Sequence, residues 1–300
     1  MESLKIAVVG AGGVGGYVAA KLAFHKVPVT LFARGKHLET IQKEGLRVIE
    51  PDGEFRAFPD TAPPKAGEVF DVVFLTVKSY DFKSACESVV PFVSSDTLVI
   101  PLSNGVGHKE TIQKYLPEVQ VCDGCVYIVS HLKSPGVIVK KTPLFYMIFG
   151  GCEDEARMDR PAKLLNDAGL KTKRSDNARY DCWKKYLFIA TFGTLTSYYE
   201  MGMKEVYTRH RDEVEQLLFE IKTVANALGV PVSEEDIAKV YKQAENLPPN
   251  AKTSMLLDFE AGKKTELESL SGYVVHEARE LGLDVPLMQK CYESLKERDV

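Results

Sequence analysis

The feature that most constrains the fold is a glycine-rich turn between an apolar strand and an apolar helix near the start of the chain. The run Lys5-Ile-Ala-Val-Val is followed by Gly10-Ala11-Gly12-Gly13-Val14-Gly15, and a helical pattern begins within these glycines. In this context the G-x-G-x-x-G motif is typical of dinucleotide binding. Gly10 permits the tight turn, Gly12 lets the backbone approach a pyrophosphate, and Gly15 lets helix and strand pack closely. We therefore expect these six residues to contact a dinucleotide; the alternative is a tight turn without a ligand.

The first half of the chain alternates short β-branched runs with helical patterns, which predicts a parallel sheet with crossover helices. We expect strands at 5–9, 29–32, 72–77, 97–101 and 119–129, and helices at 14–24, 37–44, 81–90 and 108–115. Around Pro135-Gly136 the pattern changes, and residues 136–139 and 145–149 are expected to pair antiparallel at one edge. A helix over 153–166 and a short strand over 170–172 follow.

After about Asn177 the strand patterns stop. Helices are expected at 180–199, 212–228, 234–245, 253–261, 265–281 and 286–297, and Gly229, Gly262 and Gly282 stand where left-handed helix ends would need them. The predicted fold class is therefore α/β. A Rossmann-type dinucleotide-binding domain over 1–176 precedes an all-helical substrate and catalytic domain over 177–300.

The composition excludes several classes of protein. Thirty-eight Lys and Arg against 42 Asp and Glu give a net charge of −4, which lacks the basic footprint of a nucleic-acid binder. No apolar run reaches the roughly 18–20 residues that span a bilayer, so no membrane partner is expected. The N-terminus lacks the pattern of a secretion signal. The chain is expected to act in the cytoplasm.

Cysteine and histidine usage supports neither a disulfide framework nor a metal site. Six cysteines in 300 residues are too sparse for such a framework, and we expect reduced thiols. Cys122-Asp123-Gly124-Cys125 resembles half of a zinc or redox site, but it has no second ligand pair, so buried thiols are the better interpretation. The six histidines show no ligand spacing.

The residues after the second predicted strand indicate which cofactor is preferred. An NAD-type site has an acidic residue there that binds the ribose 2′-hydroxyl. This chain has Ala33-Arg34-Gly35-Lys36 instead. The planar fork of Arg34 can bind a 2′-phosphate, with Lys36 assisting, so NADP(H) is favoured. The alternative is a solvated surface arginine.

Lys78 and Asn104 each follow a predicted parallel strand, where ligands bind in open α/β sheets. Both are therefore candidates for the ribose and nicotinamide end of the cofactor. The alternatives are a solvated lysine and an Asn-Gly turn.

The helical half offers candidates for the chemistry. Lys185 shares a predicted helix face with Ile189 and Gly193, and a lysine beside a bound ketone could protonate the oxygen after hydride transfer. The periodicity does not separate it from Lys184. Ser254 and Glu266 lie on either side of the break at Gly262, which can bring both toward one cleft. Their alternatives are a helix-start residue and a capping box, Thr265 to Glu268.

These motifs together resemble the ketopantoate reductase (2-dehydropantoate 2-reductase) family from end to end. The resemblance rests on KIAVVGAGGVGGYVAAKL, Arg34, LTVKSYD at Lys78, PLSNGVG at Asn104, W-x-K at 183–185, TSMLLD at Ser254 and GKKTELE at Glu266. It implies an NADPH-dependent reduction of the 2-oxo group of ketopantoate in pantothenate biosynthesis.

The resemblance also implies roles for individual residues. Lys185 would be the general acid, Glu266 would orient substrate and lysine close to the cofactor, and Ser254 would bind the substrate carboxylate. Asn104 and Lys78 would lie near the nicotinamide ribose, with Asn104 also reaching the substrate. A homodimer is possible, since dimers are common in the family.

One departure from the family pattern concerns the substrate. The family usually has two asparagines after W-x-K, which help to hold the substrate, and this chain has Ile189 and Gly193 there. Gly193 still lines the expected substrate site, and Thr191, Thr194 or Ser197 could supply the missing polar group. The leading function is reduction of a 2-oxo acid, by default 2-dehydropantoate to pantoate. The alternatives are a related enzyme for another small oxo or hydroxy acid, or a catalytically weak NADP-binding sensor.

Overall fold

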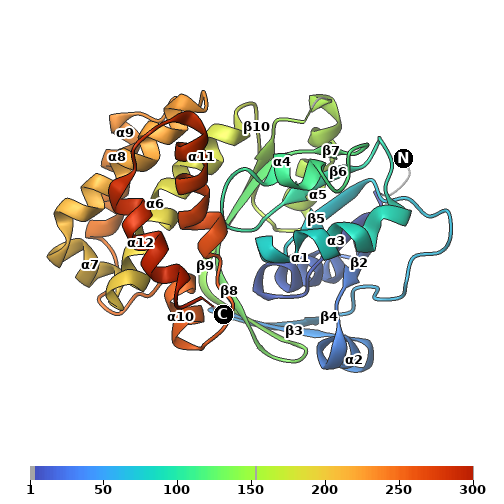
Figure 1. Ribbon diagram of the computed structural model, residues 1–300. Helices are drawn as coiled ribbons and strands as arrows, with labels where there is room; N and C mark the ends of the chain where they lie inside the picture. The colour runs from blue at the N-terminus through green and yellow to red at the C-terminus, as the bar shows by residue number, and fades with distance from the viewer. Residues whose placement is uncertain (1–3, 153, 300) are drawn as a thin grey trace. The chain divides into compact units, whose positions relative to one another are not determined.

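The computed structural model describes residues 4–152 and 154–299, and the chain divides into two compact units. The sheet unit comprises Met1–Ser103 and His108–Ala178, and the helical unit comprises Asn104–Gly107 and Arg179–Val300. Apart from Asn104–Gly107, the helical unit is coloured yellow to red in Figure 1. That short segment belongs to the helical unit although a strand of the sheet unit ends only three residues before it, at Pro101.

The sheet unit contains a five-stranded parallel sheet in the order β2-β1-β5-β6-β7, which confirms the predicted alternation of strands and helices. The strands are β1 (Ile6–Val9), β2 (Val29–Phe32), β5 (Val72–Leu75), β6 (Leu98–Pro101) and β7 (Gln120–Val121). The helical segments are α1 (Gly13–Phe24), α2 (Gly35–Glu44), η1 (Ser79–Asp81), α3 (Phe82–Val89), η2 (Val90–Phe92) and α4 (His108–Gln113).

Helices cover both faces of this sheet. Val8 of β1 belongs to the same buried cluster as Leu22 of α1, whereas the next residue, Val9, belongs to a second cluster with Phe82 of α3. Alternate residues of a strand point to opposite faces, so α1 and α3 lie on opposite sides. This explains why strand β1 is apolar at every position.

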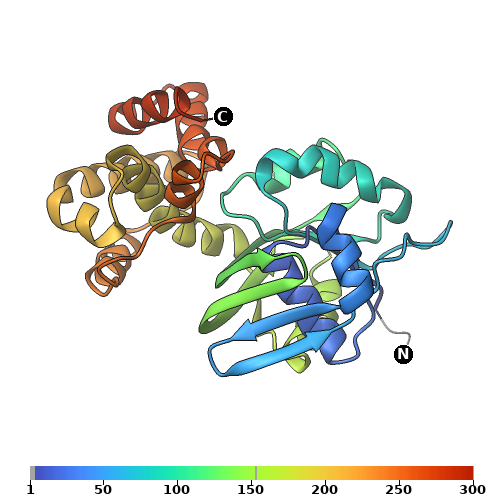
Figure 2. The ribbon, with the colours of Figure 1, turned by 90° about the horizontal axis from the view of Figure 1, so that it is seen from below.

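A second sheet has the order β10-β9-β3-β4, and β8 pairs with β9. Figure 2 shows the β3–β4 hairpin in blue beside the long green β8–β9 hairpin. Its strands are β3 (Leu46–Glu50), β4 (Gly53–Ala57), β8 (Asp123–Ser134), β9 (Val137–Gly150) and β10 (Thr172–Ser175). The segments η3 (Glu155–Met158) and α5 (Asp159–Asp167) lie between β9 and β10; Glu153, the expected start of that helix, lies outside the described residues.

Two predictions for this sheet are wrong. The expected strands 136–139 and 145–149 do not pair with each other, because residues 137–139 and 145–149 lie in the single strand β9, which pairs antiparallel with β8. The chain reverses at Gly136, whose φ is +76°. Within β9, residues 141–144 form a bulge, because Ser130 of β8 pairs with Lys140 and Ile128 pairs with Phe145. The expected strand 119–129 is also interrupted at Cys122, since β7 and β8 belong to different sheets.

The expectation of six reduced thiols is also wrong, because Cys122 and Cys152 form a disulfide. Cys122 lies between β7 and β8 and Cys152 just after β9, which brings their Cα atoms to 4.7 Å. This separation is within the range of about 4.4–6.8 Å that a disulfide needs. A contact made through sheet pairing across 30 residues leaves no local signal in the sequence. Cys125 is buried and takes no part in the disulfide, as expected.

The helical unit contains the predicted helices and one more, α7. Its segments are α6 (Ala178–Tyr199), α7 (Met203–Arg209), α8 (Arg211–Ala227), α9 (Glu234–Glu245), α10 (Ser254–Glu260), η4 (Glu268–Gly272), α11 (Tyr273–Leu281) and α12 (Pro286–Lys296). Gly229, Gly262 and Gly282 have φ of +77°, +58° and +66°, which confirms the left-handed helix ends. The expected helix 265–281 divides into the π-helical turn η4 and α11. None of the helices described is long and apolar enough to cross a bilayer.

Candidate active site

The glycine loop between β1 and α1 has the shape that its sequence predicts. Gly10 has a φ of +105°, and a Cβ there would lie 2.8 Å from Val77 Cγ1. A Cβ on Gly15 would collide with the Gly10 carbonyl oxygen and the Thr76 hydroxyl, so this glycine permits α1 to pack against the ends of β1 and β5. A Cβ on Gly12 would have no other atom within 4 Å. Gly10 and Gly15 therefore serve packing, whereas the space beside Gly12 is open.

This open space fits the pyrophosphate of a dinucleotide. Gly12 is the N-cap of α1, its backbone is extended, and no side chain caps the helix. The first N–H groups of an α-helix have no acceptor within the helix, and they favour a bound anion. The cradle residues Gly12, Gly13, Val14 and Gly15 thus present backbone donors without a side chain at Gly12 in the way.

His37 of α2 ties the glycine loop to the β8–β9 hairpin. Its Nε2 lies 2.8 Å from the Ala11 carbonyl oxygen, and its Nδ1 accepts the Gly136 N–H at 2.9 Å. Because Nδ1 must accept, Nε2 carries the proton and donates to Ala11. One neutral imidazole therefore bridges the dinucleotide loop and the turn of the hairpin. No sequence argument singled out this residue, since a lone histidine at a helix start carries no specific motif.

Arg34 stands next to this bridge. It is exposed and is the N-cap of α2, three residues before His37. The Gly10 N–H donates to the Phe32 carbonyl oxygen at 3.2 Å, so the end of β2 and the glycine loop are joined. Lys36 is also exposed, in the first turn of α2. Lys78 is partly buried three residues after β5, the strand that pairs with β1.

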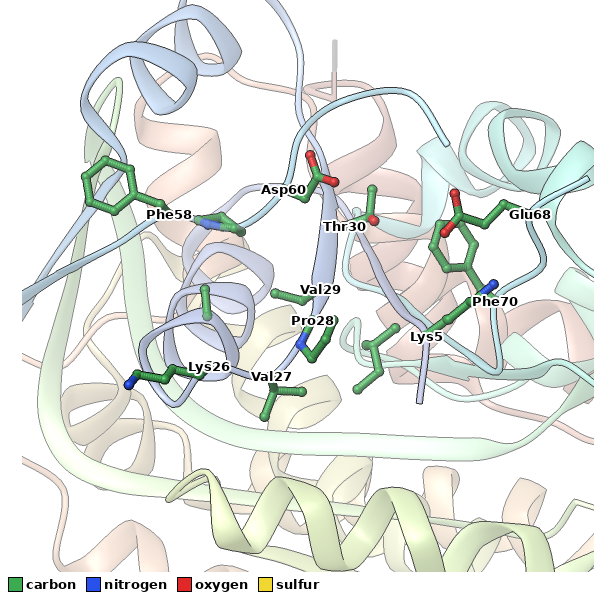
Figure 3. Close-up of a pocket in the computed structure, with 13 residues that line it drawn as sticks. Lys5, Lys26, Val27, Pro28, Val29, Thr30, Phe58, Asp60, Glu68 and Phe70 are labelled. Carbon is green, nitrogen blue, oxygen red and sulfur yellow. The ribbon is translucent and has the colours of Figure 1, made fainter. Parts of the chain in front are cut away.

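A cavity of about 370 Å³ in the sheet unit lies elsewhere (Figure 3). Its lining includes Lys5 just before β1, residues 27–30 at the start of β2, and Asp60, Glu68 and Phe70. These are the amino ends of β1 and β2, whereas the glycine loop follows the carboxyl end of β1. Ligands of open parallel sheets bind at the carboxyl ends, so this cavity is not the dinucleotide site.

In the helical unit, Lys185 and Asn104 meet although 81 residues separate them. Lys185 Nζ donates to Asn104 Oδ1 at 2.9 Å. Lys184 is held differently, since its Nζ lies 2.5 Å from Asp181 Oδ1 and 4.6 Å from the centre of the Tyr180 ring. Helical periodicity does not distinguish the two lysines, but their contacts do: Lys185 bonds an amide and Lys184 a carboxylate.

A buried aromatic cluster fixes the helix around Lys185. Trp183 and Tyr186 flank the lysine in sequence, and both rings contact Tyr273 of α11. Burial raises the pKa of Tyr186, whose hydroxyl donates to the Leu270 carbonyl oxygen. Gly107, at a φ of +70°, lies so close to the Tyr273 ring that a Cβ would clash with it. Tyr273 therefore supports both α6 and the segment that carries Asn104.

Glu266 and Ser254 occupy opposite environments. Glu266 is buried, with 2% of its surface exposed, just before η4. The capping-box alternative is not realised, because the Thr265 N–H donates to Asp299 Oδ1 and the Thr265 hydroxyl accepts the Leu267 N–H. The Glu268 carboxylate instead accepts a hydrogen bond from the Tyr292 hydroxyl at 2.8 Å. Ser254 is exposed at the first position of α10. The N-cap of α10 is Thr253, whose hydroxyl accepts the Leu256 N–H.

The hydroxyls proposed to replace the missing asparagines are buried elsewhere. Thr194 Oγ1 is 2.7 Å from Ser271 Oγ within the helical core. Thr191 and Ser197 are fully buried, six and twelve residues after Lys185, so their helix positions lie about 120° from its face. Gly193 packs against two apolar side chains, Leu270 and Met255. Among the described residues, no three His, Cys, Asp or Glu side chains gather to hold a metal ion.

Models of known families match both parts of the chain. The model of ketopantoate reductase PanE/ApbA matches residues 6–151, and that of its C-terminal domain matches residues 177–299. The uncharacterized oxidoreductase YkpB of Bacillus subtilis is 32% identical, over 98% of each chain. A 2-dehydropantoate 2-reductase of Nostoc is 27% identical, over 99% of this chain and 95% of the relative.

Solved structures give the same result. The crystal structure of 2-dehydropantoate 2-reductase from Porphyromonas gingivalis has a TM-score of 0.85 and 30% identity, covering 98% of this chain and 99% of that one. These similarities confirm the predicted fold class and the family resemblance.

Proposed function

Because this chain belongs to the ketopantoate reductase family, we propose that it reduces a small 2-oxo acid to the 2-hydroxy acid with NADPH, by default 2-dehydropantoate to pantoate. That it is an oxidoreductase follows from the family itself. The choice of NADPH, the substrate, a role in pantothenate biosynthesis and action in the cytoplasm belong to the proposal.

The observation that carries the proposal is the hydrogen bond between Lys185 and Asn104. It joins Lys185 of the W-x-K motif to an amide on the loop after β6, whereas Lys184 pairs with Asp181 in its own turn of helix. When bound, the reduced nicotinamide supplies a hydride to C2 of the oxo acid. Lys185 donates a proton to the carbonyl oxygen, which becomes the hydroxyl of the product.

Other residues bind and orient. Backbone N–H groups of the glycine loop hold the pyrophosphate, and Arg34, with Lys36, holds the 2′-phosphate. Lys78 and Asn104 contact the ribose and nicotinamide, and Asn104 also keeps the Lys185 ammonium directed. Ser254, exposed at the start of α10, binds the substrate carboxylate, and Glu266 orients the lysine and the substrate.

The test is consumption of NADPH by the purified protein with 2-dehydropantoate and with a panel of other 2-oxo acids, followed at 340 nm. Turnover of at least one acid is expected, with NADPH preferred over NADH. Tight binding of NADPH without turnover of any acid would contradict the reductase and favour the sensor.

A further inference from the structure

We propose that the substrate of this chain is a 2-oxo acid whose side chain is apolar and branched and carries no hydroxyl. The inference rests on the proposed reductase function and puts such an acid in place of 2-dehydropantoate as the preferred substrate. It follows from the side chains on the α6 face that carries Lys185.

The first observation is the composition of that face. Successive helix residues turn by about 100°, so Ile189 lies about 40° and Gly193 about 80° around the helix axis from Lys185. Ile189 is partly exposed, as Lys185 is, and stands one turn further along the helix. A substrate whose carbonyl oxygen meets Lys185 therefore faces a branched hydrocarbon at the next turn.

The second observation is the surroundings of Gly193. A Cβ built there would lie 3.3 Å from Leu270 Cδ1 and 3.7 Å from Met255 Cε. Leu270 and Met255 are themselves buried, with 2% and 1% of their surface exposed. Hydrocarbon and a thioether thus occupy the room beside position 193, and a polar side chain would enter it only if Leu270 moved.

The third observation is that the hydroxyl nearest to this face already has partners. Thr196 lies about 20° from Lys185 around the axis, three turns along. Its hydroxyl donates to the Phe192 carbonyl oxygen at 2.6 Å and lies 2.7 Å from Thr253 Oγ1. Thr194 points to the other side, where it bonds Ser271. The hydroxyls of Thr191 and Ser197 have no hydrogen-bond partner among the described residues, but both are fully buried about 120° away from this face, where a substrate hydroxyl does not reach them.

Ile189 and the apolar surroundings of Gly193 favour a substrate side chain without a hydroxyl over one that carries it. A site that hydrogen-bonds a substrate hydroxyl rejects the analogue without it by several orders of magnitude. An apolar pocket works in the opposite direction but more weakly, and rejects an added hydroxyl by about 10²-fold at most. We therefore expect a preference of about 10- to 100-fold for the side chain that lacks the hydroxyl.

A matched pair of substrates tests this directly. 2-Dehydropantoate and 3,3-dimethyl-2-oxobutanoate share the carbon skeleton, and the second replaces the hydroxymethyl group by a methyl. The kcat/KM of the wild-type protein with NADPH should be about 10- to 100-fold higher for 3,3-dimethyl-2-oxobutanoate. An equal or higher kcat/KM for 2-dehydropantoate would overturn the proposal. Reduction of neither acid, with turnover of another acid of the panel, would overturn this proposal alone. No turnover of any acid would overturn the reductase function as well, which separates the two failures.

Two variants then locate the preference. Ile189→Asn places an amide on the Lys185 face, so the ratio of the two kcat/KM values should move toward 2-dehydropantoate by about tenfold. Ile189→Leu, the matched apolar change, should keep the preference for the methyl side chain. An unchanged ratio in Ile189→Asn would refute the role of this face. If that variant fails to fold, as judged by circular dichroism, the wild-type ratio still decides the proposal.

Discussion

The two units hold their candidate residues in place by different means. In the sheet unit, Gly10, Gly12 and Gly15 are positioned by the backbone itself, at the turn from β1 to α1. In the helical unit, Lys185 is positioned by side chains distant in sequence, namely Asn104 and Tyr273. The glycine turn depends on residues adjacent in sequence and is therefore recognisable as a motif. The position of Lys185 depends on packing between residues that are distant in sequence.

The two units are also proposed to differ in function. Residues of the sheet unit are proposed to bind the phosphates of the cofactor, and residues of the helical unit, Asn104 included, to act at the nicotinamide and the substrate. Variants in the sheet unit should therefore change KM for NADPH with little effect on kcat, and variants around Lys185 should do the reverse. Three predictions test this separation.

The largest effect is expected for Lys185→Ala. Loss of a general acid typically costs 10²–10⁴-fold in rate, so kcat should fall by roughly that factor. The dissociation constant of NADPH, measured by fluorescence titration, should stay within about threefold of wild type, because the cofactor loop is untouched.

The neighbouring lysine supplies the control. Lys184→Ala removes the same charge one residue earlier, from a side chain that pairs with Asp181. Its kcat should remain close to that of the wild type. A large fall in kcat for Lys184→Ala, with Lys185→Ala nearly normal, would exchange the roles of the two lysines.

A smaller effect is expected for Arg34→Ala. Hydrogen bonds to a charged group contribute about 1.5–3 kcal/mol, so KM for NADPH should rise by about 10- to 100-fold. KM for NADH, which has no 2′-phosphate, should change little, and so should kcat. Lys43→Ala, which removes an exposed charge from the last turn of the same helix, is the control. Equal losses for NADPH and NADH would refute contact with the 2′-phosphate.

The smallest effect is expected at His37. Each of its two hydrogen bonds contributes about 1 kcal/mol, so His37→Ala should raise KM for NADPH roughly fivefold while kcat stays within about twofold. Glutamine can reach the Ala11 carbonyl, as Nε2 does, whereas asparagine can only replace the Nδ1 acceptor for Gly136.

These two replacements distinguish positioning from stability. If the bond to Ala11 orders the cofactor loop, His37→Gln should restore KM more fully than His37→Asn. A lower melting temperature with unchanged KM in all three variants would show that His37 only stabilises the fold.

Local patterns predicted the five-stranded parallel sheet well, because the determinants of its strands are local. The β1 run, the glycine turn and the apolar strands β5 and β6 all follow from residues within one element. The β3–β4 hairpin was not predicted from the sequence, because its two strands are short and partly polar on either side of Pro51-Asp52. The Cys122–Cys152 disulfide and the single strand β9 depend on pairing between distant segments, which periodicity does not report.

The candidate residues in the helical unit were less accessible to sequence reasoning. Spacing placed Lys184 and Lys185 on a helix but did not rank them, because their distinguishing partners are Asp181 and the distant Asn104. Thr191, Thr194 and Ser197 looked equally suitable as polar replacements, yet their hydroxyls are buried away from the Lys185 face. The contacts of Gly193 with Leu270 and Met255 could come only from the packed structure.

The assignment of Asn104–Gly107 to the helical unit bears on how such proteins can be recombined. The chain enters that unit twice, first for these four residues and again from Arg179 onward. A chimaera joined at residue 178 would combine Lys185 from one parent with the Asn104 loop of the other, and Tyr273 with a foreign Gly107. Exchange of the helical unit between relatives should therefore carry residues 104–107 along with residues 179–300. The segment that must be exchanged as one unit is therefore discontinuous in sequence.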